Sequence, residues 1–190
     1  IVVIGQSTGG PNTIMEVLPV LPENLGASVI IIQHMPGSFT PSFAQRLDNN
    51  CALPIKEAER GDIIESNRGY LAPGDYHMLL APRGMGKPEA LVRLASEPSD
   101  ALHKPSVDVT MMSALKFYEG PNIIAVLLTG MGADGADAMA AIRRAGGRTI
   151  AESEETCVVF GMPREAIARG GAEFVLPAYK IGEKIVELVQ

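Results

Sequence analysis

The chain has few cysteines, no block of basic residues and no long hydrophobic run. Its two cysteines, Cys51 and Cys157, stand at no motif spacing, which favours reduced thiols in a cytoplasmic protein over a disulfide framework. Acidic and basic residues are interspersed at a net charge of −6, and no aromatic-basic stripe indicates a nucleic-acid-binding face. The longest apolar runs, such as VIII and IIAVLL, are too short to span a bilayer. We therefore expect no nucleic-acid partner and no membrane insertion.

What the chain does contain suits one globular domain. Its 190 residues are 46% hydrophobic and 20% charged, and they include no low-complexity segment, as is typical of folded proteins. No linker divides the sequence, so we expect a single domain over 1–190. The first residue is an isoleucine inside an apolar strand pattern. We therefore expect the chain to be a fragment, with residues removed upstream.

Short apolar runs alternate with helical patterns along most of the chain. Several of the runs are continuously hydrophobic, as in parallel strands that are covered on both faces. The predicted strands are 1–5, 28–33, 122–128, 148–152 and 173–176. Helical spacing links Phe39, Phe43 and Leu47; Val107, Met111, Leu115 and Tyr118; Ala138, Ala141, Ile142 and Ala145; and Ile181, Ile185, Leu188 and Val189. This order predicts a doubly wound, three-layer α/β/α fold with a mostly parallel sheet.

The segment from about 60 to 95 departs from this pattern. Its β-like runs, GYLAPGDYHMLLAP and EALVRL, are separated by Pro-Gly and glycine-rich turns and show no helical period. Such runs are typical of antiparallel strands joined by short turns. We expect an antiparallel hairpin or meander here, at the edge of the sheet.

Three chemically reactive residues follow predicted strands. Ser7 follows the first strand within a G-x-S-x-G pattern, His34 follows the second, and Asp134 follows the strand at 122–128. Because ligands of open α/β sheets bind beyond the carboxyl ends of the strands, these side chains are expected at one edge. A hydroxyl, an imidazole and a carboxylate together can perform acyl transfer: the histidine takes the serine proton and the carboxylate orients the histidine.

Each of these residues also has a structural interpretation. Ser7 and Asp134 both precede helices, where a serine or an aspartate commonly caps the N-terminus. His77 and His103 compete with His34 for the role of base, but neither directly follows a strand of the parallel sheet. The three histidines and two cysteines show no ligand spacing, so we expect no zinc site.

A dinucleotide-binding module is the alternative function. The segment 130–135 reads G-x-G-x-x-G between a strand and a helix, and Glu152 follows 22 residues after Gly130. This interpretation leaves Ser7 and His34 without a role, and it places Asp134 beside a pyrophosphate. A phosphate loop at 5–11 lacks the lysine that such loops require, and Cys157 lies in a segment that reads as buried packing.

Six segments in register resemble one family. IGQSTGG, QHMPGSFTPSFAQRL, YLAPGDYHM, HKPSVDV, LLTGMGADGADAM and CVVFGMPREAI together resemble the catalytic domain of the CheB family, the bacterial chemotaxis protein-glutamate methylesterases. The resemblance runs from the first residue to about 180. Gln6, where a smaller residue is expected, and the ESEET segment depart from the family pattern.

The resemblance implies a serine hydrolase without a cofactor. It implies demethylation of glutamate γ-methyl esters on the cytoplasmic helices of chemoreceptors, with release of methanol, and deamidation of receptor glutamines. The family's serine, histidine and aspartate fall on Ser7, His34 and Asp134. It also implies an upstream receiver domain, phosphorylated by the chemotaxis histidine kinase, that occludes the active site until phosphorylation. By analogy with a nucleophile elbow, we expect oxyanion donors at the backbone N–H of Thr8 and of Met131 or Gly132.

Overall fold

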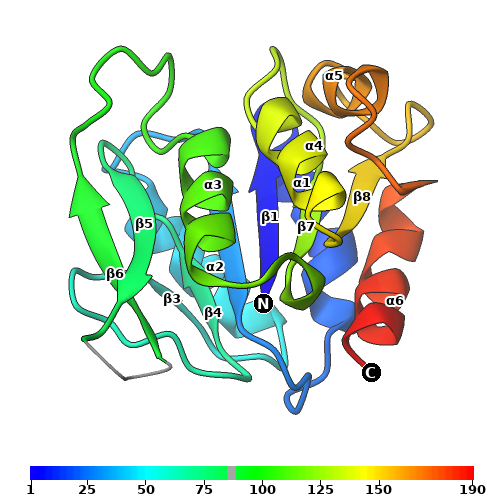
Figure 1. The fold of residues 1–190 in the computed structure, drawn as a ribbon. Coiled ribbons are helices and arrows are strands. Elements are labelled where there is room, and N and C mark those ends of the chain that lie inside the picture. The colour runs from blue at the N-terminus through cyan, green and yellow to red at the C-terminus, as the bar shows by residue number, and fades with distance from the viewer. Residues whose placement is uncertain (85–88) are drawn as a thin grey trace.

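The computed structural model describes residues 1–84 and 89–190, which form a parallel sheet of seven strands, a small antiparallel sheet and the helices around them (Figure 1). Across the large sheet the order is β3-β4-β2-β1-β7-β8-β9, with parallel neighbours throughout. Its strands are β1 (Val2–Gln6), β2 (Val29–Gln33), β3 (Ile55–Glu57), β4 (Gly69–Leu71), β7 (Ile124–Leu127), β8 (Arg148–Glu152) and β9 (Phe174–Leu176). The predicted α/β class and the five predicted strands are confirmed.

Helices cover both faces of this sheet. On one face lie α1 (Gly10–Val17), α2 (Thr40–Asn50) and α6 (Ala178–Val189), and on the other lie α3 (Val107–Phe117), α4 (Ala136–Arg144) and α5 (Met162–Ala168). Short 3-10 turns at Leu18–Val20 and Gly120–Asn122 complete the connections. Side chains of β1 alternate between the two cores, so Val2 and Ile4 pack with the first helix set and Val3 with the second. This alternation explains why the strand is apolar at every position.

The middle of the chain differs in part from the prediction. β5 (His77–Pro82) and β6 (Ala90–Ala95) do pair as antiparallel strands, but they form their own two-stranded sheet. The GYL run, expected in the same meander, is instead β4 of the parallel sheet. Three-residue strands such as β3 and β4 are too short to show a period in the sequence. The hairpin packs on α3, where Ser113 Oγ accepts a hydrogen bond from Leu80 N at 3.0 Å and Thr110 Oγ1 donates to Met78 O at 2.8 Å.

The strand order determines what meets at the carboxyl edge of the sheet. β1 is central, with β2 on one side and β7 on the other. The connection from β1 runs to α1 on one face and the connection from β7 runs to α4 on the opposite face. Open α/β sheets bind ligands at such a switch point. Within the ranges described, no helix has the length and apolar character needed to cross a membrane.

Core packing on α2 gives a test of the fold. Leu47 is fully buried between α2 and the sheet, whereas Gln45 on the same helix is exposed. We expect Leu47→Ala to lower the free energy of unfolding by about 2–5 kcal/mol, since it leaves a cavity in a packed core. Gln45→Ala, the control, should change it by less than about 0.5 kcal/mol in urea titrations. Equal effects of the two substitutions would contradict the packing described.

Candidate active site

Ser7 directly follows the central strand β1, and its backbone is held from both sides. Its N–H donates to Thr129 O at 2.9 Å, beyond the end of β7. On the other side, His34 N donates to Gln6 O at 3.1 Å. The order of the strands therefore brings the segments that carry Ser7, His34 and Thr129 into contact, although they lie far apart in the sequence.

His34 and Asp134 form a direct pair. His34 Nε2 lies 2.7 Å from Asp134 Oδ2, and both side chains are largely buried, with 6% and 14% exposed. An ionised carboxylate can only accept hydrogen bonds, so the proton is placed on Nε2 of the neutral imidazole. Nδ1 is then the nitrogen with a free lone pair. This is the reverse of the chymotrypsin arrangement, in which the carboxylate bonds Nδ1.

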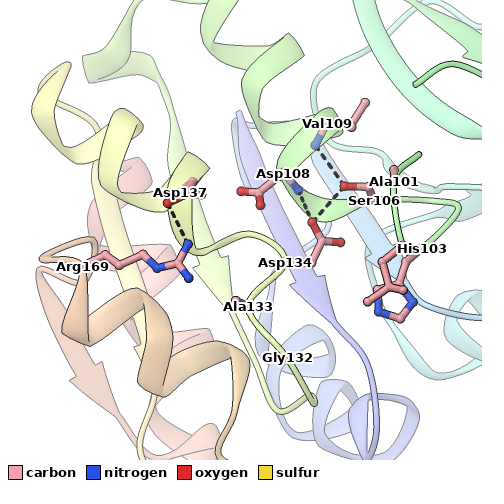
Figure 2. Close-up of a pocket in the computed structure, with 11 residues that line it drawn as sticks. Ala101, His103, Ser106, Asp108, Val109, Gly132, Ala133, Asp134, Asp137 and Arg169 are labelled. Atoms are coloured by element: carbon pink, nitrogen blue, oxygen red, sulfur yellow. Dashed lines mark hydrogen bonds and ion pairs between the residues drawn. The ribbon is translucent and has the colours of Figure 1, made fainter. Parts of the chain in front are cut away.

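Asp134 is also bound to the first turn of α3. Its Oδ2 accepts from Val107 N at 2.7 Å. Its Oδ1 accepts from Asp108 N at 2.9 Å and from Ser106 Oγ at 2.8 Å (Figure 2). Burial alone would raise the pKa of Asp134, but the hydrogen bonds from His34 and from the backbone of Asp108 and Val107 outweigh it and lower the pKa. The carboxylate therefore stays ionised, with every hydrogen bond directed at its charge.

The capping interpretations of Ser7 and Asp134 are wrong in this structure. The N-caps of α1 and α4 are Gly9 and Gly135, both in the left-handed region with φ of 86° and 93°, and neither helix has a side-chain cap. Asp134 instead binds the N-terminus of a different helix, α3. Asp108, in the first turn of α3, in turn accepts from Ala138 N of α4 at 2.8 Å. The N-terminus of α3 thus binds the carboxylate that precedes α4, and the N-terminus of α4 binds a carboxylate from α3. The helix dipole favours negative charge at both places.

The imidazole of His34 and the serine line a common cavity. Ser7 and His34 line the same cavity of about 420 Å³, together with Met35, Pro36, Asp75, His103 and Lys104. Nδ1 of His34 is buried and has no hydrogen-bond partner in the described part of the chain. The hydroxyl of Ser7 is not bonded to it here. Catalytic hydrogen bonds are often loose without substrate and tighten in the complex.

Two polar residues that the sequence analysis did not select hold this turn. The Gln33 side-chain amide donates to Ser7 O at 3.0 Å and to His34 O at 3.1 Å, so one group joins the backbones that carry the hydroxyl and the imidazole. Thr129 Oγ1 donates to Thr8 O at 2.9 Å and accepts from Val159 N at 2.9 Å. Gln33 and Thr129 both lie at strand ends, next to His34 and to the glycine-rich turn at 130–135. This position is the one indication of their role in the sequence.

The glycine-rich turn after β7 lies against Ser7. A Cβ on Gly130 would stand 2.8 Å from Ser7 Cβ, so only glycine permits this approach. Outside the helices and strands, no backbone hydrogen bond among the described residues uses the N–H of Thr8, Met131 or Gly132. These three predicted donors are therefore available at the edge where Ser7 lies.

The departure at Gln6 is accommodated by another glycine. Gln6 is fully buried, and a side chain on Gly10 would collide with it. The amide nitrogen and oxygen of Gln6 have no partners among the residues described. The larger residue thus fits beneath α1 because position 10 has no Cβ, and the turn at Ser7 keeps its bonds to the neighbouring strands.

The two other histidines have different environments. His77 is fully buried: its Nδ1 accepts from Ser106 N at 3.2 Å and its Nε2 lies 3.1 Å from Pro98 O, so both nitrogens are used. His103 stacks on His34 with ring centroids 3.9 Å apart and planes 18° apart. The sequence marks His103 as a competing base in the loop before α3, and nothing in that position indicates this contact.

The features of the dinucleotide alternative have other uses. Glu152, which would bind a ribose hydroxyl, is fully buried and accepts from Thr129 N at 2.7 Å and Thr156 Oγ1 at 2.9 Å. Burial raises its pKa, and these hydrogen bonds oppose the shift. Burial and the nearby Glu152 likewise raise the pKa of Cys157, which disfavours a nucleophilic thiolate.

A second cavity of about 420 Å³ lies on the other side of His103. It runs from His103 past Asp134 and the turn at Gly132 to an ion pair in which Arg169 Nη1 lies 2.7 Å from Asp137 Oδ1 (Figure 2). Leu102, which is 88% exposed, stands at its rim. His103 thus lines both cavities.

Comparison with known proteins gives a consistent result. A family model described as CheB methylesterase matches residues 2–185. Over the whole chain, the sequence is 53% identical to a protein-glutamate methylesterase/protein-glutamine glutaminase of Caldanaerobacter subterraneus subsp. tengcongensis and 46% identical to the protein of that name from Thermotoga maritima. The chain spans about half of each, 51% and 54%.

A solved structure agrees with these sequence matches. The crystal structure of the Thermotoga maritima CheB methylesterase catalytic domain superposes with a TM-score of 0.93 at 44% identity, covering 98% of this chain and 97% of that one. The similarity thus extends over the whole fold, including the edge at which Ser7, His34 and Asp134 lie. The chain belongs to the CheB methylesterase family.

Proposed function

We propose that this chain is the hydrolase part of a protein-glutamate methylesterase that also deamidates glutamines. Its substrates are γ-methyl-glutamate side chains on the cytoplasmic helices of chemoreceptors, and its products are glutamate and methanol. The observation that carries the proposal is the buried His34–Asp134 pair: its imidazole lines one cavity with Ser7, and its Nδ1 has no partner among the described residues. The names of the relatives, protein-glutamate methylesterase/protein-glutamine glutaminase, support the choice of substrate.

In the proposed reaction the serine is acylated and then freed by water. Ser7 Oγ attacks the γ-carbonyl carbon while His34 Nδ1 takes the hydroxyl proton, and Asp134 stabilises the imidazolium through Nε2–H. The tetrahedral intermediate collapses as the carbon–oxygen bond to methanol breaks, and Nδ1 returns the proton to the methoxide. Water repeats these steps on the acyl-enzyme. With a glutamine substrate the leaving group is ammonia.

The oxyanion needs preorganised donors close to Ser7. The backbone N–H of Thr8 is the first proposed donor, because it follows the nucleophile as in a nucleophile elbow. The N–H of Met131 or Gly132 is the second, since that turn lies against Ser7 and its N–H groups are unused. Loss of one such donor typically lowers kcat by about 10²–10³.

The wider organisation belongs to the same proposal. Since the chain spans about half the length of the relatives, we propose that the whole protein carries a receiver domain upstream. Phosphorylation of that domain by the chemotaxis histidine kinase would uncover the active site. The protein would act in the cytoplasm, at receptor clusters.

Substitution of the serine tests the nucleophile. Ser7→Ala should abolish methanol release from methylated receptor membranes, and it should leave the unfolding transition unchanged, because the Ser7 side chain neither caps α1 nor bonds His34. Ser42→Ala is the matched control, since within the described part of the chain Ser42 Oγ bonds Phe39 O alone, at the exposed start of α2. If Ser7→Ala retained most of the activity, Ser7 would not be the nucleophile.

Substitution of the aspartate tests the tautomer. An asparagine offers one acceptor and one donor group to a site that holds four donors, so its NH₂ group would face a donor or force the proton of His34 onto Nδ1. We expect Asp134→Asn to lower kcat on the order of 10³–10⁴-fold. Asp137→Asn, in the same segment but on the exposed ion pair with Arg169, should stay within about twofold. Equal activity of the two variants would contradict the role of Asp134.

The dinucleotide alternative is tested by labelling. A serine-directed phosphonofluoridate should modify Ser7 in the wild-type chain and fail to modify Ser7→Ala. Titration with NAD(H) should show no binding, because the carboxylate of Glu152 is buried. Binding of NAD(H) without labelling would favour the alternative. Cleavage of small esters as fast as methylated receptor helices would instead indicate a general ester hydrolase.

A further inference from the structure

The ring of His103 covers the face of the proposed base. The centroids of His34 and His103 are 3.9 Å apart, and the planes differ by 18°. Stacked rings in this geometry attract each other but exchange no hydrogen bond. The contact therefore acts on the orientation of the His34 plane and leaves both ring nitrogens of His34 to Asp134 and Ser7.

The loop that carries His103 is fixed at several points. His77, buried beneath it, bonds Pro98 O through Nε2 and accepts from Ser106 N through Nδ1. Between these points, Lys104 O accepts from Asp75 N at 3.2 Å. The backbone on either side of His103 is thus tied to the hairpin and to the loop after β4, so that the ring is held over His34.

His34 needs such a support. Among the described residues, its side chain makes one hydrogen bond, at one edge, from Nε2 to Asp134. A single bond fixes one atom and allows the ring to pivot, and the opposite atom, Nδ1, is buried without a partner in the region the structure describes. A flat group against the ring face restricts that pivot and so holds the plane of the imidazole, which lines one cavity with Ser7.

We propose that His103 is a positioning residue for His34: its ring holds the plane of the base, and protonation of His103 stops the reaction because it opposes the imidazolium that His34 must form. The inference rests on the proposed function and adds a second titrating group to its site. His103 itself does not touch the reacting atoms in this role.

The charges around His103 favour its neutral form at neutral pH. Burial and the neighbouring His34 lower the pKa of His103, and Asp134 partly opposes this shift. Lys104 from its own loop and Asp75 from the loop after β4 also face the cavity, as do Asp108, Asp137 and Arg169 on the other side of the ring. Because the ring centroids are 3.9 Å apart, a proton on His103 opposes positive charge on His34.

Two variants separate stacking from titration. His103→Phe keeps a flat ring without a titrating proton and should keep kcat within about threefold at pH 8, whereas His103→Ala should lower kcat about tenfold with little change in KM. In a plot of log kcat/KM against pH, the slope on the acid side should exceed one in the wild type and should stay at one in His103→Phe. Ser99→Ala, at an exposed position of the same loop, should resemble the wild type.

NMR titration of the histidine rings tests the coupling without substrate. In the wild-type chain the ring signals of His34 should respond when His103 is protonated, because the two rings are stacked, and this response should be absent in His103→Phe. The same His34 response in both proteins, superimposable acid limbs, or an unchanged kcat in His103→Ala would overturn the proposal. These results are distinct from a failure of the proposed function, which would appear as absence of methanol release by the wild type.

Discussion

The binding of the Asp134 carboxylate to the first turn of α3 is the interaction on which the rest of the site depends. A buried carboxylate is unfavourable unless donors surround it, and here the donors come from Val107 N, Asp108 N, Ser106 Oγ and His34 Nε2. The four bonds join the turn after β7, the start of α3 and the residue after β2. The same contact that packs α3 against α4 thus also orients the imidazole.

The exchange of carboxylates between the two helices makes this arrangement reciprocal. Asp134 precedes α4 and binds the N-terminus of α3, while Asp108 lies in α3 and accepts from Ala138 N of α4. Each carboxylate satisfies N–H groups that would otherwise lack partners at a helix end. Displacing one helix would therefore leave unpaired groups on both, so the His34–Asp134 geometry is a consequence of how two helices dock and is not set by the loop alone.

The layers of the fold and the residues of the site could be predicted, but the contacts between them could not. Continuous apolar runs predicted the long parallel strands, and the strand-end positions of Ser7, His34 and Asp134 predicted that these residues lie at one edge. Gly69–Leu71 was predicted to be part of an antiparallel meander, but it pairs parallel with β2 and β3, because a run of three residues does not show the direction in which it pairs. That Asp134 binds α3 and not the helix that follows it depends on tertiary packing. So does the stacking of His103, because its loop could have taken other paths.

The arrangement also explains the chain order of the three residues, which is serine, histidine, aspartate. In the α/β-hydrolases, which have a different scaffold, the aspartate or glutamate precedes the histidine. What brings the groups together is the order of neighbouring strands, β2-β1-β7, with Ser7 after the central strand and a partner from each flank. The histidine must come from one neighbour and the carboxylate from the other, whatever their separation in sequence. Asp134, which comes from the β7 side, bonds Nε2 of the imidazole, the opposite nitrogen from the one that the carboxylate bonds in chymotrypsin, and Nδ1 has no partner among the described residues.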